Sequence, residues 1–118
     1  MNYELVKEDE YLIIKITGSP FVNERLVSHK SLLQHLTADT RKVIVDLEGL
    51  EEGQPLFSLG GILNTLKKEV QLQGGGMKLC SLRPKIGRYF QERSLDRIFN
   101  IQYSIEEAKK SFEDEKDD

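Results

Sequence analysis

The hydroxyl of Ser58 is the side chain whose position most strongly invites chemistry. It lies in EEGQPLFSLGGIL, residues 51–63, which follows an apolar run and opens a segment of helical periodicity. In α/β domains, a loop between a central strand and a helix N-terminus is where function tends to lie. As a helix cap, Ser58 would stabilise the helix by about 1 kcal/mol. As a phosphoacceptor, it would hold a dianion where the helix dipole favours negative charge. Physical chemistry alone favours the cap.

Asp46 is the second candidate. It interrupts the apolar run KVIVDL near the C-terminal end of the expected central strand. Ligands and partners bind at that edge of a parallel sheet. Two roles stay open for this carboxylate. It could accept backbone hydrogen bonds from the loop that follows, or it could contact a ligand or partner.

The other groups that could bind metals or act as nucleophiles favour structural roles. His29 and His35 are six residues apart, on different sides of one expected helix, and neither has a second ligand at metal-binding spacing. Cys80 lies in an apolar run without adjacent cations, which is typical of a buried thiol. The runs LGG at 59–61 and GGG at 74–76 match no phosphate-binding motif. We therefore expect no metal, no cofactor and no enzymatic activity.

Basic residues gather in RPKIGRYFQER, namely Arg83, Lys85, Arg88 and Arg93. Acidic residues lie close by in the sequence, a pattern typical of a solvated helix face. The alternative is a docking site for an acidic partner surface.

The elements that must position these groups follow from periodicity. Strands are expected at 3–6, 11–18, 42–47, 77–82 and 100–103, and the first two form a hairpin. Helices are expected from about 23 to 36, from 59 to 70, after Pro84, and after a capping box at Ser104. The order predicts an α/β fold with a mixed, mostly parallel sheet, an N-terminal β-hairpin and about four helices.

Composition limits the classes of function. The chain of 118 residues is long enough for one domain, expected over 1–112, followed by an acidic disordered tail at 113–118. A net charge of −3 gives no reason to expect nucleic acid. No apolar run is long enough to cross a bilayer, and the N-terminus does not resemble a secretory signal. A single cysteine suits a reducing compartment, so we expect a cytoplasmic protein.

Several segments together resemble the STAS domains of bacterial anti-sigma factor antagonists. They are KVIVDLEGL, LGGIL and GGGMKLCSLRPKIGRYFQERSLDRIFNIQYSIEEA, in that order, between about residue 10 and residue 112. The resemblance implies a STAS-type fold and regulation by partner switching. A family member binds an anti-sigma factor, often a serine kinase, and thereby frees a sigma factor. Phosphorylation of a serine at the helix start breaks that binding, and a phosphatase restores it.

The sequence departs from the family at this serine. The family carries D-S-S-G before L-G, and the corresponding residues here are Pro55, Leu56, Phe57 and Ser58. The acceptor position is therefore Phe57. Sliding the register by one residue would bring Ser58 into place, but it would rotate the helical stripe by about 100°.

We therefore expect a non-enzymatic interaction domain that binds an anti-sigma factor or serine-kinase-like protein, with a phosphatase as a further partner. The phosphoserine is expected to be displaced or lost, with Ser58 as the remaining candidate. The expected binding loop comprises Asp46, Leu56, Phe57, Ser58, Leu59 and Gly60. We expect neither nucleic acid nor membrane as a partner, and a monomer or weak homodimer. The alternative is a STAS module that senses a nucleotide or anion, or a scaffold that does not act on a sigma factor.

Overall fold

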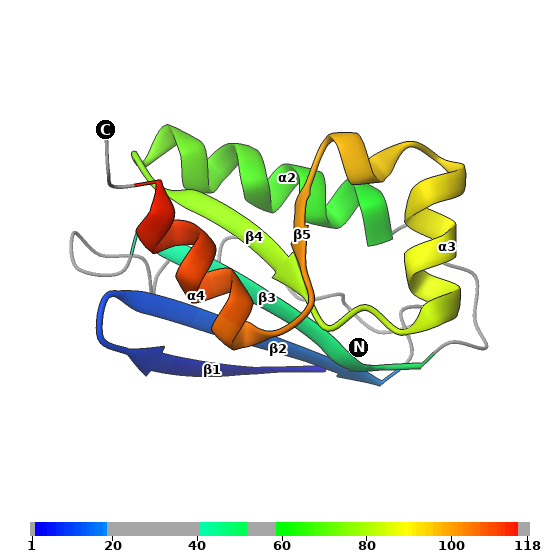
Figure 1. The fold of residues 1–118 in the computed structure, drawn as a ribbon, viewed down its shortest axis with the longest axis horizontal. Helices are drawn as coiled ribbons and strands as arrows, with labels where there is room; N and C mark the ends of the chain where they lie inside the picture. Colours follow the sequence, from blue (N-terminus) through cyan, green and yellow to red (C-terminus); the bar gives the residue numbers. More distant parts are fainter. Residues whose placement is uncertain (1, 19–40, 52–58, 116–118) are drawn as a thin grey trace.

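The computed structural model describes residues 2–18, 41–51 and 59–115. The expected helix at 23–36 lies outside these ranges, as do His29, His35 and residues 56–58. The described strands are β1 (Asn2–Glu8), β2 (Tyr11–Gly18), β3 (Lys42–Leu50), β4 (Gly76–Cys80) and β5 (Asn100–Gln102). The helices are α2 (Leu59–Leu72), α3 (Pro84–Glu92), the short 3-10 helix η1 (Leu95–Arg97) and α4 (Ile105–Asp114), as Figure 1 shows.

The five strands form one sheet in the order β1-β2-β3-β4-β5. β1 and β2 pair antiparallel as a hairpin, and each later pair is parallel. This arrangement confirms the predicted mixed α/β fold. The parallel strands place their C-terminal ends at one edge of the sheet, which is where the sequence placed its candidate residues.

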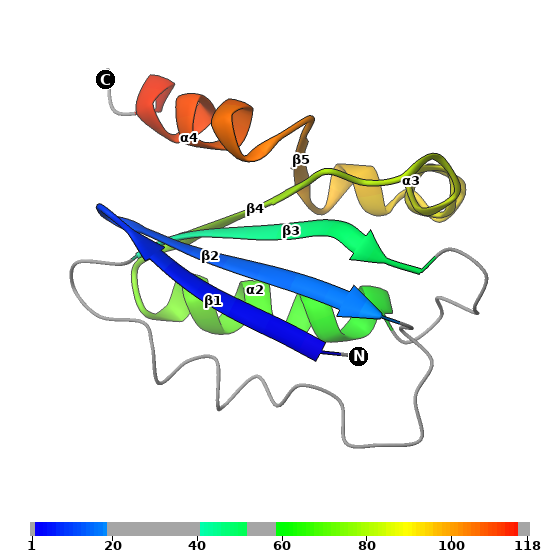
Figure 2. The ribbon, with the colours of Figure 1, turned by 90° about the horizontal axis from the view of Figure 1, so that it is seen from below.

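Helices cover both faces of the sheet, α2 on one side and α4 on the other (Figure 2). The side chains of the sheet divide accordingly. One core cluster includes Leu12, Val45, Leu63, Leu79 and Phe90. The other includes Tyr11, Ile13, Ile44, Cys80 and Phe112. Because both faces of β3 are covered, its apolar residues run almost without interruption.

Local signals set the ends of α2 and α4 as predicted. Gly74 adopts a φ of +84° after α2, and the Gly75 N–H donates to the Val70 carbonyl at 2.9 Å. This left-handed C-terminal cap is accessible to glycine at no steric cost. At the start of α4, the Ser104 hydroxyl accepts from the Glu107 N–H at 3.1 Å, as the capping box predicts.

Two strands differ in extent from the sequence-based expectation. β4 ends at Cys80 rather than at residue 82, since Ser81 has a φ of +61° and leaves the extended conformation. β3 continues past residue 47 to Leu50 because it accommodates an extra residue. That irregularity lies beside Asp46 and belongs to the candidate site.

Candidate functional site

The candidate site lies at the end of the molecule where β3 ends and α2 and α3 begin, on the right in Figure 1. Of the expected binding residues, Asp46 belongs to β3, and Leu59 and Gly60 are the first two residues of α2. The structure therefore brings the two ends of the expected loop to one edge of the sheet. Leu56, Phe57 and Ser58 lie outside the described residues.

Asp46 organises the end of β3. Lys15 of β2 pairs with Asp46, but Thr17 pairs with Gly49, so β3 carries one residue more than β2 across this interval. This is a β-bulge, which bends a strand and leaves a backbone group without its ladder partner. The buried Asp46 carboxylate supplies such a partner, because its Oδ1 accepts from the Glu48 N–H at 3.0 Å. Of the two roles left open for Asp46, the structure contains the backbone hydrogen bond.

Gly49 lets β2 and β3 approach closely beyond the bulge. A Cβ at this position would lie 2.6 Å from Cγ2 of Thr17 and 3.5 Å from the Ile16 carbonyl oxygen. Real Cβ atoms do not tolerate the first of these distances, so the strand pair requires glycine here. The sequence signal was available, since glycine is rare inside a strand and often marks a bulge.

Arg83 ties β3 to the start of α3. Its Nε donates to the Glu48 carbonyl oxygen at 2.8 Å, so both backbone groups of Glu48 are held by side chains. Arg83 precedes Pro84, the first residue of α3, and thus lies outside the helical face to which its sequence position had assigned it. The proline signal alone could have separated Arg83 from that face.

The first turn of α2 rests on η1. A Cβ on Gly60 would approach Cδ1 of Leu95 to 3.1 Å, whereas one on Gly61 would meet no described atom within 4 Å. Gly60 therefore keeps α2 close to η1, and Leu95 is a contact that the helical pattern did not predict. The two described segments on either side of residues 52–58, the end of β3 and the start of α2, are therefore both held by contacts with the rest of the fold.

Cys80 lies near the same edge of the sheet, but its thiol is poorly reactive at neutral pH. Its side chain is buried, and burial raises the pKa of the thiol from 9.0 to about 11, opposed in part by a hydrogen bond with Ser81. The nucleophilic thiolate is therefore scarce at neutral pH. The expected role of Cys80 as a small core residue is confirmed.

Within 2–18, 41–51 and 59–115, no three His, Cys, Asp or Glu side chains come together as a metal site would require. In the same part of the chain, no helix is both long and apolar enough to span a bilayer.

Comparison with known proteins agrees with the fold described above. The STAS domain family matches residues 2–108. The NMR structure of the protein TM1081 superimposes with a TM-score of 0.75 at 22% identity, over 93% of this chain and 87% of that one. A substituted RsbS from Moorella thermoacetica gives 0.68 at 17% identity, over 97% of each chain. The anti-sigma factor antagonist SpoIIAA, in its unphosphorylated form, gives 0.64 at 16% identity, over 95% of this chain and 96% of that one.

At these identities, the superpositions show a shared fold. The family match covers nearly the whole chain, from the first described strand into α4. The chain therefore belongs to the STAS domain family.

Proposed function

We propose that the chain is a non-enzymatic interaction domain that acts in the cytoplasm as an anti-sigma factor antagonist. Its partner would be an anti-sigma factor of the serine-kinase type, and its binding would control transcription by partner switching. The observation that supports the proposal is that Asp46 of β3 and the first two residues of α2, Leu59 and Gly60, lie at one edge of the sheet. The hydrogen bond of Asp46 at the bulge and the packing of Gly60 on Leu95 hold these two described segments in place. A binding surface with preorganised flanks loses less conformational entropy on binding.

The loop would present an apolar docking patch. Leu56 and Phe57 occupy the positions of the two serines in the family pattern, and apolar and aromatic side chains dominate the energetic centres of protein interfaces. In our proposal, Ser58 serves mainly as the N-cap of α2. Kinase and phosphatase would then act weakly or not at all on this protein, and binding would be constitutive.

The loss of the acceptor serine would change the regulation. A phosphate in a docking surface carries close to two negative charges at neutral pH and opposes burial against a partner. Phe57 cannot acquire that charge. The affinity for the anti-sigma factor would therefore depend on the amounts of the proteins and not on the phosphorylation state.

A pull-down from the source organism, followed by binding measurements with purified partner, tests this function. Recovery of a protein with a histidine-kinase-like ATPase domain is the expected result. Leu56→Ala and Phe57→Ala should each weaken its binding by about tenfold or more. Leu72→Ala is the matched control, because Leu72 is 80% exposed at the opposite end of α2. Equal binding by the Leu56 and Leu72 variants would contradict the proposed docking loop.

A further inference from the structure

An open groove lies between α3, η1 and the end of β5, outside the expected binding loop. Its volume is about 340 Å³, at the lower end of the range of about 300–1,000 Å³ that ligand pockets occupy. Leu82 and Ile101 provide apolar lining, and Gln91 provides a primary amide, which can donate and accept hydrogen bonds at once, as a peptide group does. Gln102 also lines the groove, but its amide nitrogen donates to Asn100 Oδ1 at 2.6 Å and to Ser111 Oγ at 3.5 Å, so it offers its amide oxygen as an acceptor. We refer to this feature as the α3 groove.

Gly87 keeps the α3 groove open. It lies in the interior of α3 and lines the groove, although glycine disfavours a helix relative to alanine. A Cβ at Gly87 would meet no described atom within 4 Å. The packing of the described part of the chain therefore does not require this glycine, and any larger side chain would project into the groove.

Tyr103 leaves a large aromatic side chain in water at the same groove. It follows β5 directly, lines the groove and is 93% exposed. Tyrosine supplies contact area at low entropic cost and is enriched in protein interfaces. A groove lined by apolar residues, side-chain amides and an exposed tyrosine has the composition of a peptide-binding surface.

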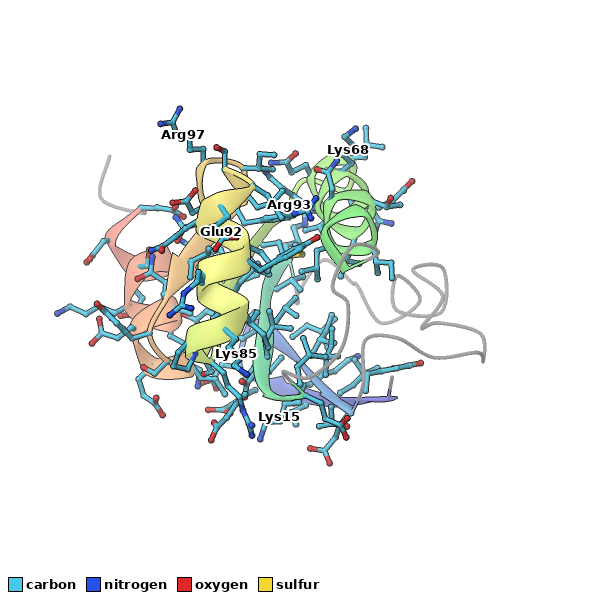
Figure 3. The ribbon with its side chains drawn as sticks, turned by 90° about the vertical axis from the view of Figure 1, so that its right-hand side faces the viewer. Lys15, Lys68, Lys85, Glu92, Arg93 and Arg97 are labelled. Atoms are coloured by element: carbon cyan, nitrogen blue, oxygen red, sulfur yellow. The ribbon has the colours of Figure 1, made fainter. Side chains whose placement is uncertain are left out.

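Basic residues lie next to the α3 groove in the sequence, although the one charged residue among the described residues that line it is Asp96. Arg88 and Arg97 each directly follow a lining residue, and neither forms an ion pair with a described carboxylate. Arg83 follows Leu82 but donates to the Glu48 carbonyl oxygen. Residues 81–97 carry five basic and two acidic side chains, in a chain whose net charge is −3. Figure 3 views this end of the molecule and shows basic side chains around α3, from Lys85 at one side to Arg97 at the other.

We propose that the α3 groove binds an acidic segment of a partner protein. An apolar residue of that segment enters the groove beside Tyr103, and its flanking carboxylates contact Arg88 and Arg97. The Asp96 carboxylate, which also lines the groove, accepts from a backbone N–H of the segment. None of the described residues that line the groove belongs to the expected binding loop, so this inference does not depend on the proposed function.

Charge distribution favours a protein segment over other polyanions. Residues 81–97 carry an excess of basic over acidic side chains, whereas the chain as a whole is acidic, with a pI near 5.5. A long nucleic acid or an anionic bilayer would meet repulsion from the remaining surface. A short segment can place its carboxylates on the arginines alone, which gives the local charge complementarity typical of protein recognition.

Titration of the full-length, isotope-labelled chain by NMR tests the assignment. The probe is a synthetic peptide with one central leucine flanked by Asp and Glu, raised to ~1 mM, where weak binding is still measurable. We expect shifts at Gly87, Gln91, Gln102 and Tyr103. An analogue with Asn and Gln flanks should bind at least fivefold more weakly, because its charge is lost. Equal binding of both peptides, or no binding at this concentration, would overturn the proposal.

Matched variants separate the groove from a general charge effect. Gly87→Leu should weaken binding by about tenfold or more by filling the groove, while Gly87→Ala should change it by less than about twofold. Arg88→Glu with Arg97→Glu should weaken it by about three- to tenfold, as expected for exposed charges. The control Lys110→Glu lies on α4 and should have no effect. Undiminished binding by Gly87→Leu would contradict the site.

Other occupants of the α3 groove would give different results in the same NMR titration. Anionic vesicles or single-stranded RNA that shift the same residues more strongly than the acidic peptide would assign the surface to another class of partner. Shifts of these residues that grow with protein concentration, without any peptide, would assign it to a second copy of the chain. Either outcome would overturn the proposal of an acidic partner segment.

Discussion

The Asp46 carboxylate accepts the backbone N–H of Glu48, only two residues further along β3, at 3.0 Å. This contact satisfies the backbone where the bulge removes a ladder partner. Asp46 thereby stabilises the end of β3, the strand that precedes the residues we propose to bind a partner.

Replacement of Asp46 should separate the contribution of its hydrogen bond from that of its charge. Asp46→Ala leaves a backbone N–H without its acceptor and should lower the free energy of unfolding by about 1–3 kcal/mol. Asp46→Asn keeps an oxygen in the same place and should cost much less. Urea denaturation of both variants measures the difference. Equal destabilisation would mean that the carboxylate charge, and not the hydrogen bond, stabilises the bulge.

The close approach of β2 and β3 gives a second prediction. Gly49→Ala places a Cβ against Cγ2 of Thr17 and should destabilise the protein by about 1–3 kcal/mol through overpacking. Thr17→Ser removes that methyl group. The double variant should therefore recover most of the loss in thermal denaturation, after subtraction of the effect of Thr17→Ser alone. No recovery would show that the constraint is the contact with Thr17 Cβ and the Ile16 carbonyl oxygen, which Thr17→Ser leaves in place.

The raised pKa of the Cys80 thiol predicts that the free energy of unfolding depends on pH in the alkaline range. Burial raises its pKa to about 11, so between pH 9 and 11 the unfolded chain loses this proton while the folded chain keeps it. The thiol then favours unfolding, and stability should fall across that window by as much as about 2 kcal/mol. Its contribution vanishes well below pH 9, where the thiol is protonated in both states.

The measurement compares the pH dependence of wild type with that of Cys80→Ala by urea denaturation. The slopes should agree below pH 9 and diverge above it, with the steeper fall in wild type. Parallel curves up to pH 11 would contradict the assignment of a buried, protonated thiol.

Lys78 is a buried cation that pairs with an exposed carboxylate, so weakening the pair and removing the cation should have different effects on stability. Its side chain is 3% exposed, and its Nζ donates to Ser111 Oγ at 2.6 Å and to Glu115 Oε1 at 3.0 Å. Glu115→Gln weakens the only ion pair of a buried cation in the described residues and should cost about 1 kcal/mol. Lys78→Met removes the charge and its desolvation, so its stability should lie within about 1 kcal/mol of wild type. A much larger loss in Lys78→Met would show that the ion pair is strongly stabilising.

Local signals predicted the elements, while the details at the site required tertiary contacts. Leu63, Leu66 and Val70 lie at helical spacing, and the glycines at 74–76 mark the end of that helix, so α2 followed from the sequence. The extension of β3 did not, because the bulge depends on pairing with β2. The packing of Gly60 on Leu95 also joins elements that are distant in sequence.

The charged residues of α3 show a further limit of prediction from sequence patterns. Arg88 and Glu92 are four residues apart on α3, a spacing that permits an ion pair. The two described side chains form none, so the positive charge stays available to a partner. Helical spacing allowed both outcomes, and the groove at Gly87 could not be predicted at all, since it depends on how α3 lies against β5.

The central claim is that this protein binds an anti-sigma factor through a loop that phosphorylation no longer controls. The most direct test incubates the chain with its purified kinase-type partner, Mg²⁺ and ATP, then measures intact mass and binding affinity on the same sample. Ser58→Ala treated in parallel is the control. We predict no phosphate on Ser58, with affinity unchanged by ATP and equal in both proteins. Stoichiometric phosphate on Ser58 with loss of binding, absent from Ser58→Ala, would contradict the account.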